Sequence, residues 1–257
     1  MRAAALDRFG GPDVLTLHVV PVPEIDPSEV LIATHTAGVG SWDAEMREGW
    51  WPGSKRPRLP LVLGTDGSGT IAAVGSRVRR FAPGDIVYSY SFATSNGGFY
   101  AEYVAVAAEM VGRPPEILSL KEAGAVATTG LTAIQGIDDA LHVKRGEAVV
   151  IHAASGGVGS LALQFAKMRG ARVLATASGR DGVAFVRRLG ADAAVDGRRE
   201  DLAAAALAFA PGGVDALLAF VGGKPLTRSG NGSQADSRNQ AAARVHERYL
   251  LWRWRGW

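Results

Sequence analysis

Cysteine is absent from this sequence of 257 residues. The chain can therefore form no disulfide, no thiolate nucleophile and no zinc site with cysteine ligands. Long apolar runs are also missing, and none approaches the roughly 20 residues that a membrane helix requires. The N-terminal stretch MRAAALDRFGG has no apolar segment before Asp7 and Arg8. We therefore read no signal peptide there and expect a soluble, cytoplasmic protein.

The chain also lacks an excess of positive charge outside its C-terminal end. Residues 224–257 hold seven of the 28 basic and two of the 25 acidic side chains, so residues 1–223 carry a net charge of −2. The high isoelectric point, about 9.4, thus belongs to the C-terminal segment. With a net charge of −2, residues 1–223 offer no basic surface for phosphate backbones. We therefore expect no nucleic-acid or membrane partner.

Two patterns divide the remaining sequence. Up to about residue 115, short apolar runs such as EVLIATHTAGVG and GDIVYSY alternate with Gly, Pro and Asp, which predicts a β-rich region. From about residue 120, strands at 148–153, 171–177, 193–196 and 214–222 alternate with helical segments. This alternation predicts parallel βαβ units in a doubly wound sheet, with the domain boundary near residues 115–125.

The glycine-rich stretch HAASGGVG follows the strand predicted at 148–153 and opens a helix. Glycines at 156 and 157 would let a pyrophosphate approach the backbone, and Gly159 would let the helix pack closely on the strand. The alternative is a bend that serves packing alone, since such patterns are common. The βαβ context favours a dinucleotide turn made by Ala154, Ser155, Gly156, Gly157, Val158 and Gly159.

The end of the second strand of this series bears on the choice of cofactor. An NAD site usually places an acidic residue there to hold the ribose hydroxyls. This chain has Ser178 and Arg180 instead, which could hold the 2′-phosphate of NADP(H). Asp181 leaves NAD open, and Arg180 could also be a solvated residue at a helix start.

Several motifs together identify a resemblance, among them FGGPDVL, GTDGSGTIAAVGSRVRRFAPGDIVY, GGFYAEYVAV, GLTAIQGI and HAASGGVGSLALQFAKMRGARVLATA. Residues 1 to about 223 resemble the zinc-independent quinone oxidoreductase branch of the medium-chain dehydrogenase/reductase superfamily, which is the zinc-type alcohol dehydrogenase-like superfamily. The resemblance implies an α/β protein with a GroES-like β-rich domain at 1–118 and an incomplete Rossmann NADP-binding domain at 119–229. It further implies NADPH-dependent hydride transfer to quinones or α,β-unsaturated carbonyls and, for the full-length family, a homodimer.

The resemblance also bears on metal binding. Zinc-dependent relatives carry a cysteine where Gly40 stands and a Gly-His-Glu sequence where this chain has Gly64, Thr65 and Asp66. We therefore expect no metal. Without a Lewis acid, reduction of a conjugated carbonyl is easier than alcohol oxidation, since the substrate itself spreads the arriving charge.

By resemblance, the substrate side is lined by Ser41, Trp42 and Asp43, and Thr132 lies beside the nicotinamide. Each has a structural alternative: Trp42 could be a core residue, Asp43 could cap a short helix and Thr132 could cap a helix turn. His35 and His152 lie in strand-like runs and are read as core residues.

The cofactor side departs from the family at two positions. Gly182 replaces a lysine that the family often uses for the 2′-phosphate, and Gly197 replaces a tyrosine, although Arg198 and Arg199 follow it.

Residues 230–257 form an Arg- and Trp-rich tail in which we expect no strand of the family's kind. We interpret it as the product of a truncated reading frame, which would leave the sheet with an unpaired edge after its fourth strand. A real amphipathic tail that binds a partner or a membrane surface is the alternative. A catalytically inactive nucleotide-binding remnant and an enoyl-thioester reductase are the alternatives for function.

Overall fold

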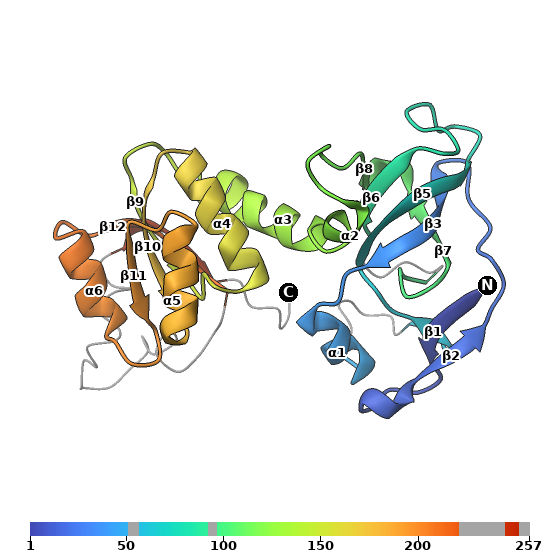
Figure 1. The fold of residues 1–257 in the computed structure, drawn as a ribbon, viewed down its shortest axis with the longest axis horizontal. Helices are drawn as coiled ribbons and strands as arrows, with labels where there is room; N and C mark the ends of the chain where they lie inside the picture. The colour runs from blue at the N-terminus through green and yellow to red at the C-terminus, as the bar shows by residue number, and fades with distance from the viewer. Residues whose placement is uncertain (51–56, 92–96, 221–244, 252–257) are drawn as a thin grey trace. The chain divides into compact units, whose positions relative to one another are not determined.

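The chain divides into two compact units, Met1–Thr128 and Thr129–Gly256. The computed structural model describes residues 1–50, 57–91, 97–220 and 245–251 (Figure 1). A β-rich N-terminal unit is followed by a C-terminal unit with a parallel sheet between helices. This is the mixed α/β architecture that the sequence predicts.

The N-terminal unit contains two antiparallel sheets with the strand orders β2-β1-β4 and β7-β3-β5-β6-β8. Short helices accompany the strands. The strands are β1 (Arg2–Leu6), β2 (Leu15–Val19), β3 (Glu29–Ala37), β4 (Leu61–Val62), β5 (Asp66–Val74), β6 (Ile86–Tyr90), β7 (Tyr103–Ala107) and β8 (Val111–Gly112), and the helices are η1 (Pro12–Val14), α1 (Ser41–Arg47), η2 (Ala108–Met110) and α2 (Leu120–Ala123).

The core of the larger sheet follows from the two-residue period of its strands. Val30 and Ile32 of β3 are fully buried and pack with Ile71, Val87 and Val104 from the neighbouring strands. Such alternation places one face of each strand in the core and the other toward the surface. The runs EVLIATHTAGVG and GDIVYSY thus form β3 and β6, as predicted.

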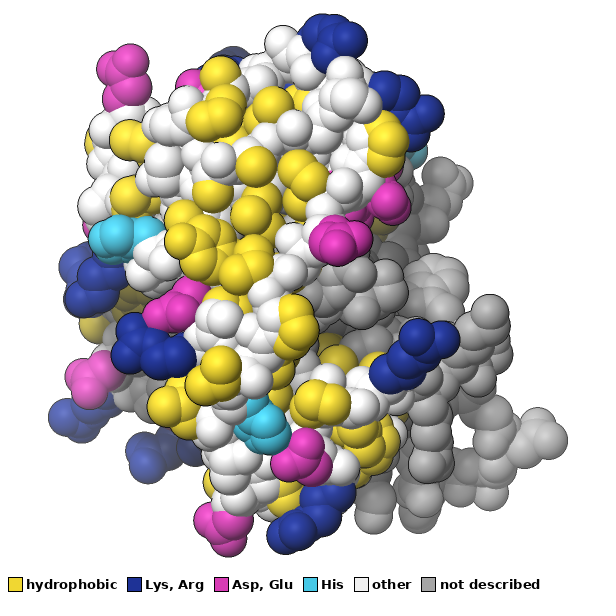
Figure 2. Space-filling view, turned by 90° about the vertical axis from the view of Figure 1, so that its right-hand side faces the viewer, with side chains coloured by type: hydrophobic (Ala, Val, Ile, Leu, Met, Phe, Trp, Pro, Cys, Tyr) yellow, Lys and Arg dark blue, Asp and Glu magenta, His cyan; other side chains and the backbone are white. Residues whose placement is uncertain are grey.

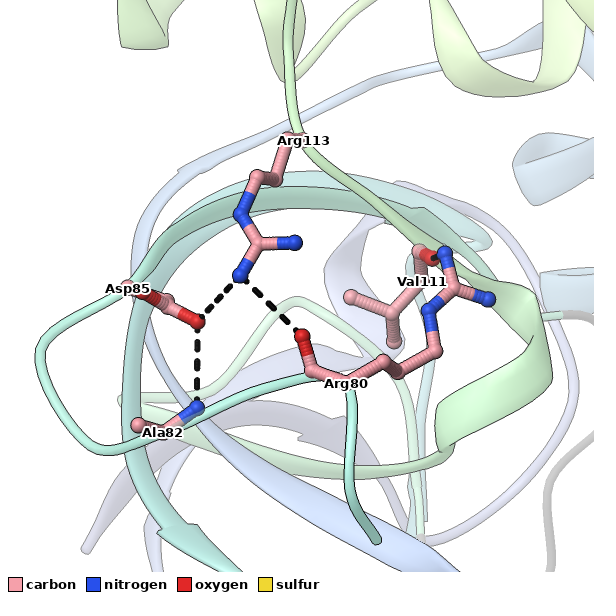
Figure 3. Close-up of polar contacts among 5 residues, drawn as sticks. All are labelled: Arg80, Ala82, Asp85, Val111 and Arg113. Atoms are coloured by element: carbon pink, nitrogen blue, oxygen red, sulfur yellow. Dashed lines mark hydrogen bonds and ion pairs between the residues drawn. The ribbon is translucent and has the colours of Figure 1, made fainter.

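Two arginines, Arg80 and Arg113, join the loop before β6 to β8 and the residue that follows it (Figure 3). The Arg80 and Arg113 guanidinium groups lie 4.7 and 5.0 Å from the centre of the Phe81 ring. Arg113 also donates to Asp85 Oδ2 over 2.7 Å, and Arg80 donates to the Val111 carbonyl over 3.2 Å. These contacts hold the loop before β6 against β8, the outer strand of the sheet.

The surface of this unit carries many apolar side chains (Figure 2). On β2, an outer strand, Leu17 and Val19 are 75% and 86% exposed. The basic side chains on the face that Figure 2 shows are interspersed with acidic ones rather than gathered into one patch.

The C-terminal unit has one sheet with the order β11-β10-β9-β12-β13, and all its strand pairs are parallel. This is the order of the first five strands of a Rossmann sheet. The strands are β9 (Ala148–His152), β10 (Arg172–Ala177), β11 (Ala193–Asp196), β12 (Val214–Ala219) and β13 (Val245–Leu251), and the helices are α3 (Ala127–Ile134), η3 (Gln135–Ala140), α4 (Gly157–Met168), α5 (Gly179–Arg188) and α6 (Leu202–Phe209). No helix in the described part of the chain is long and apolar enough to span a bilayer.

Helices cover both faces of this sheet. Val149 and Ile151 of β9 point into a core shared with α4 and α5, whereas Val150 points into a second core shared with α6. Strands buried on both faces read as continuous apolar runs, which explains AVVI in β9. Asp201 caps the start of α6, and its carboxylate accepts from the Ala203 amide over 2.8 Å.

The prediction for the tail is wrong in one respect. Residues 245–251 form β13, which pairs in parallel with β12, so β12 does not end the sheet. The sequence VHERYLL contains the branched and aromatic residues that suit a strand, and the surrounding Arg and Trp residues concealed this pattern. The other residues of the tail lie outside those that the structure describes.

Candidate functional site

The glycine turn lies between the carboxyl end of β9 and the start of α4. Ala153 adopts the left-handed conformation with φ of 61°, which is uncommon for a residue with a side chain. Its carbonyl accepts a hydrogen bond from the Gly156 amide over 3.2 Å, and the Ala154 amide donates to the Thr176 carbonyl over 2.8 Å. The turn is therefore held both internally and by the neighbouring strand β10.

Packing requires glycine at one position of this turn but not at another. A Cβ at Gly159 would overlap the Ala153 carbonyl oxygen and the Cα atom of Ala154, so helix packing requires glycine there. A Cβ at Gly156 would meet nothing closer than the Ala153 carbonyl oxygen at 3.5 Å. Gly156 also has an ordinary φ of −81°. Neither packing nor backbone conformation demands glycine at position 156.

Gly157 resembles Gly156 in this respect. A Cβ there would lie 3.3 Å from the side-chain methyl group of Thr129 and closer to no other atom. Both residues are exposed, and the missing side chains leave open space in front of the first turn of α4. Glycine at such positions lets a ligand approach the backbone.

The start of α4 has the electrostatic character of an anion site. The first amides of a helix have no acceptor within the helix, and its dipole makes this end positive. The first turn of α4 carries no acidic side chain that would neutralise this end. The side chains of Ala154 and Val158 pack into the core, so only their backbone atoms face the turn.

The tip of β10 lies next to the glycine turn. A Cβ at Gly182 would be 3.5 Å from Ser155 Oγ, which places the first turn of α5 beside Ser155. Ser178 caps α5 by position, but its exposed side chain makes no capping hydrogen bond. Arg180 and Asp181 follow it in the first turn of α5, and both are exposed.

Thr132 lies in the interior of α3 and is half-buried. The alternative that it caps a helix turn is therefore wrong. It follows Thr129 by three residues, and residues at this spacing share one side of a helix. Because Thr129 faces Gly157, Thr132 lies one helical turn along α3 from the glycine turn.

The residues assigned to the substrate side begin helix α1 in the N-terminal unit. Asp43 caps this helix, since its Oδ2 atom accepts from the Gly40 amide over 2.7 Å. The indole of Trp42 donates to Thr65 Oγ1 over 2.7 Å, and its ring packs on a core that includes Leu6. Ser41 is the exposed first residue of the helix. Trp42 and Asp43 thus make contacts of the structural kind described as alternatives, and their assignment to the substrate side stays a prediction.

Two buried carboxyl groups belong to Asp43 of α1 and Asp66 of β5. Asp43 and Asp66 are only 5% and 2% exposed, and burial raises the pKa of both. Asp66 Oδ2 accepts from the Thr128 amide over 3.1 Å, which partly opposes the shift. The negative charge of Asp43 raises the pKa of Asp66 further.

Two tyrosines face the same carboxyl groups. Burial and the charge of Asp43 raise the pKa of Tyr100. Burial and the charge of Asp66 raise the pKa of Tyr90. No motif in the sequence indicates a role for these tyrosines. No spacing in the sequence relates positions 43, 66, 90 and 100, because only the sheet brings them together.

Potential metal ligands do not gather in the part of the chain that the structure describes. No group of three His, Cys, Asp or Glu side chains is placed there to share an ion. Thr65 and Asp66, which the resemblance aligns with zinc ligands, have other contacts: Thr65 accepts from the Trp42 indole and Asp66 accepts from the Thr128 amide.

Comparison with known proteins identifies two matching family models. Residues 26–116 match the alcohol dehydrogenase GroES-like domain, and residues 157–232 match the zinc-binding dehydrogenase domain. The quinone oxidoreductase of Pongo abelii is 40% identical over 194 residues, which are 74% of this chain and 57% of that protein. This chain therefore spans little more than half the length of that relative.

Solved structures give the same relationship. The quinone oxidoreductase from Coxiella burnetii is 37% identical, with a TM-score of 0.76 over 87% of this chain and 69% of that one. The Escherichia coli quinone oxidoreductase, solved in complex with NADPH, is 27% identical, with a TM-score of 0.76 over 84% of this chain and 65% of that one.

The buried Asp66 carboxyl group gives a testable pH dependence of stability. Its pKa in the folded chain lies above the ordinary 3.8, so the folded state binds the extra proton, and stability falls as pH rises from 3.8 through the raised value. Asp66→Asn keeps an acceptor for the Thr128 amide but cannot ionise. We expect its free energy of unfolding, relative to wild type, to rise across this range by about 1.4 kcal/mol per unit of pKa shift.

Urea denaturation at about pH 5 and about pH 8 measures this difference. The exposed Asp139 supplies the control, because Asp139→Asn should alter the pH dependence little. Identical pH profiles for Asp66→Asn and wild type would contradict the expectation.

Proposed function

The chain belongs to the quinone oxidoreductase branch of the medium-chain dehydrogenase/reductase superfamily, and we propose that it transfers hydride from NADPH to quinones or α,β-unsaturated carbonyls. The cofactor site is the turn formed by Ala154, Ser155, Gly156, Gly157, Val158 and Gly159. The observation that carries this proposal is the open backbone at Gly156 and Gly157, which internal packing does not explain. A pyrophosphate is an anion of suitable size and charge for the helix end behind it.

The choice of NADP(H) rests on the tip of β10. Arg180 is exposed in the first turn of α5, and the Ser178 hydroxyl makes no capping bond. Both groups suit a 2′-phosphate, because charge-assisted hydrogen bonds from a guanidinium are strong. The exposed Arg198 adds positive charge nearby, since the Gly197 amide donates to the Ala177 carbonyl over 2.9 Å. The complex of the related Escherichia coli enzyme with NADPH supports the same choice.

The rest of the reaction needs little chemistry from the protein. NADPH supplies the hydride when it is bound, and a conjugated acceptor spreads the arriving negative charge over its own atoms. The chain then has to hold and orient both molecules and exclude water. We assign the substrate side to Ser41, Trp42 and Asp43, and the nicotinamide side to Thr132. A metal is not required in this scheme, and Thr65 and Asp66 instead hold the Trp42 indole and the Thr128 amide.

The first experiment is a fluorescence titration of the full chain with NADPH, followed by NADPH oxidation in the presence of 1,4-benzoquinone. Binding with turnover is the expected result. Binding without turnover would leave a nucleotide-binding protein and contradict the proposed activity. Absence of binding by a chain with normal secondary structure would contradict the cofactor assignment.

Two alanine substitutions separate the ligand-facing glycine from the packing glycine. Gly156→Ala should leave the free energy of unfolding within about 0.5 kcal/mol of wild type, because a Cβ meets only ordinary contacts there. It should weaken NADPH binding at least about tenfold, since the Cβ enters the space proposed for the pyrophosphate. Gly159→Ala should instead destabilise the chain by about 1–3 kcal/mol, because its Cβ overlaps the backbone.

Titration with NADPH and urea denaturation of both variants test this contrast. If Gly156→Ala bound NADPH as tightly as wild type, the open backbone would not be the cofactor site.

Cofactor preference is tested at Arg180. Arg180→Ala should weaken NADPH binding about tenfold or more and leave NADH binding nearly unchanged, because only NADPH carries the 2′-phosphate. Arg188→Ala, at the other end of α5, removes the same charge away from the proposed phosphate and serves as the control. Equal losses for the two cofactors, or for the two variants, would contradict the assignment.

A further inference from the structure

A buried hydroxyl group connects the carboxyl ends of β9 and β10. Thr176, on β10, is 1% exposed. Its Oγ1 atom accepts a hydrogen bond from the Ala153 amide over 2.9 Å. The same atom lies 2.8 Å from Nδ1 of His152. Thr176 therefore contacts both residues that lead from β9 into the glycine turn.

The direction of the second hydrogen bond follows from donor counting. A threonine hydroxyl has one hydrogen to donate, and a buried hydroxyl rarely leaves it unpaired. The Ala153 amide is already a donor to Oγ1, so the hydroxyl hydrogen is directed to Nδ1 of His152. Nδ1 must then be unprotonated, and the neutral ring carries its hydrogen on Nε2. Burial lowers the pKa of His152, which favours this neutral form.

The amide that donates to Thr176 belongs to Ala153, the residue in the left-handed conformation. Left-handed backbone is less favourable than right-handed backbone for a residue with a Cβ. Ala153 has φ of 61° and precedes the turn that begins α4. A hydrogen bond at its amide favours the observed conformation over others, which would leave that amide unpaired.

We propose that Thr176 is a positioning residue for the dinucleotide turn: with His152 as its acceptor, it holds Ala153 left-handed and so fixes the backbone from Ala154 to Gly159 for the cofactor. The inference rests on the proposed function, because it assumes that this turn binds NADPH. Thr176 itself is buried beneath the turn and acts through Ala153. A turn that is already fixed before binding loses less conformational entropy when the ligand arrives.

Substitutions at position 176 separate the hydroxyl from the volume of the side chain. Thr176→Val keeps the shape but leaves the Ala153 amide and His152 Nδ1 without their partner. We expect NADPH to bind about tenfold more weakly to this variant. Thr176→Ser keeps the hydroxyl and should bind NADPH within about twofold of wild type.

A second substitution tests whether the effect passes through Ala153. Glycine adopts positive φ freely, so Ala153→Gly should depend less on the support of its amide. In the Ala153→Gly background, Thr176→Val should weaken NADPH binding by about threefold or less. An undiminished tenfold loss in the double variant would show that Thr176 acts by another route and would overturn the proposal.

The hydrogen bonds of Thr176 to Ala153 and His152 can also be tested without the cofactor. In ¹⁵N-labelled protein, the chemical shifts of the His152 ring should show Nδ1 unprotonated and Nε2 protonated in wild type. Amide hydrogen exchange at residues 153–159 should be faster in Thr176→Val than in wild type and little changed in Thr176→Ser. A protonated Nδ1, or exchange that is the same in all three proteins, would overturn the proposal.

These measurements distinguish the cofactor assignment from the positioning role of Thr176. If wild type bound no NADPH but showed the expected tautomer and exchange, the cofactor assignment would fail while the support of Ala153 would stand. If wild type bound NADPH and Thr176→Val bound it equally well, the positioning role would fail and the cofactor assignment would remain.

Discussion

Helix α4 begins close against the end of β9 because Gly159 has no side chain. This contact lets Ala162, Leu163 and Ala166 of α4 reach the core above the sheet. It also brings the positive end of the helix to the edge of the sheet where β9 ends. Packing and the candidate anion site therefore depend on the same close approach. The two demands fall on different residues, since Gly159 serves the contact while Gly156 and Gly157 leave space outside it.

The fold of the C-terminal unit could be predicted because each of its elements has a local signature. Buried parallel strands such as AVVIH in β9 are short apolar runs, and the helices between them have their own spacing and caps. β13 was missed because its signature is weak: a strand with charged residues becomes evident only beside its partner, β12. Pairing between segments far apart in sequence is a property of the folded chain, and composition alone does not reveal it.

The same difference between local and distant information applies to the candidate site. The glycine turn is contiguous, so its residues could be predicted together with the helix that follows them. The surroundings of Trp42 and Asp43 could not, because Thr65, which accepts from the Trp42 indole, and Asp66, whose pKa the charge of Asp43 raises, come from another part of the N-terminal unit. The strand-like run around His152 predicts a core residue. Its bond to Thr176 depends on the register between β9 and β10, which the sequence does not state.

The buried carboxyl groups have a structural use that does not require their charge. Asp43 accepts from the Gly40 amide at the start of α1, and Asp66 accepts from the Thr128 amide in the first turn of α3. Asp43 thereby fixes the start of α1, which carries the proposed site residue Ser41. A protonated carboxyl group still has a carbonyl oxygen that accepts such a bond, so the raised pKa values are compatible with this role. Because a neutral acceptor avoids the cost of burying a charge, a pair of carboxyl groups can remain in this core without a basic partner among the described residues.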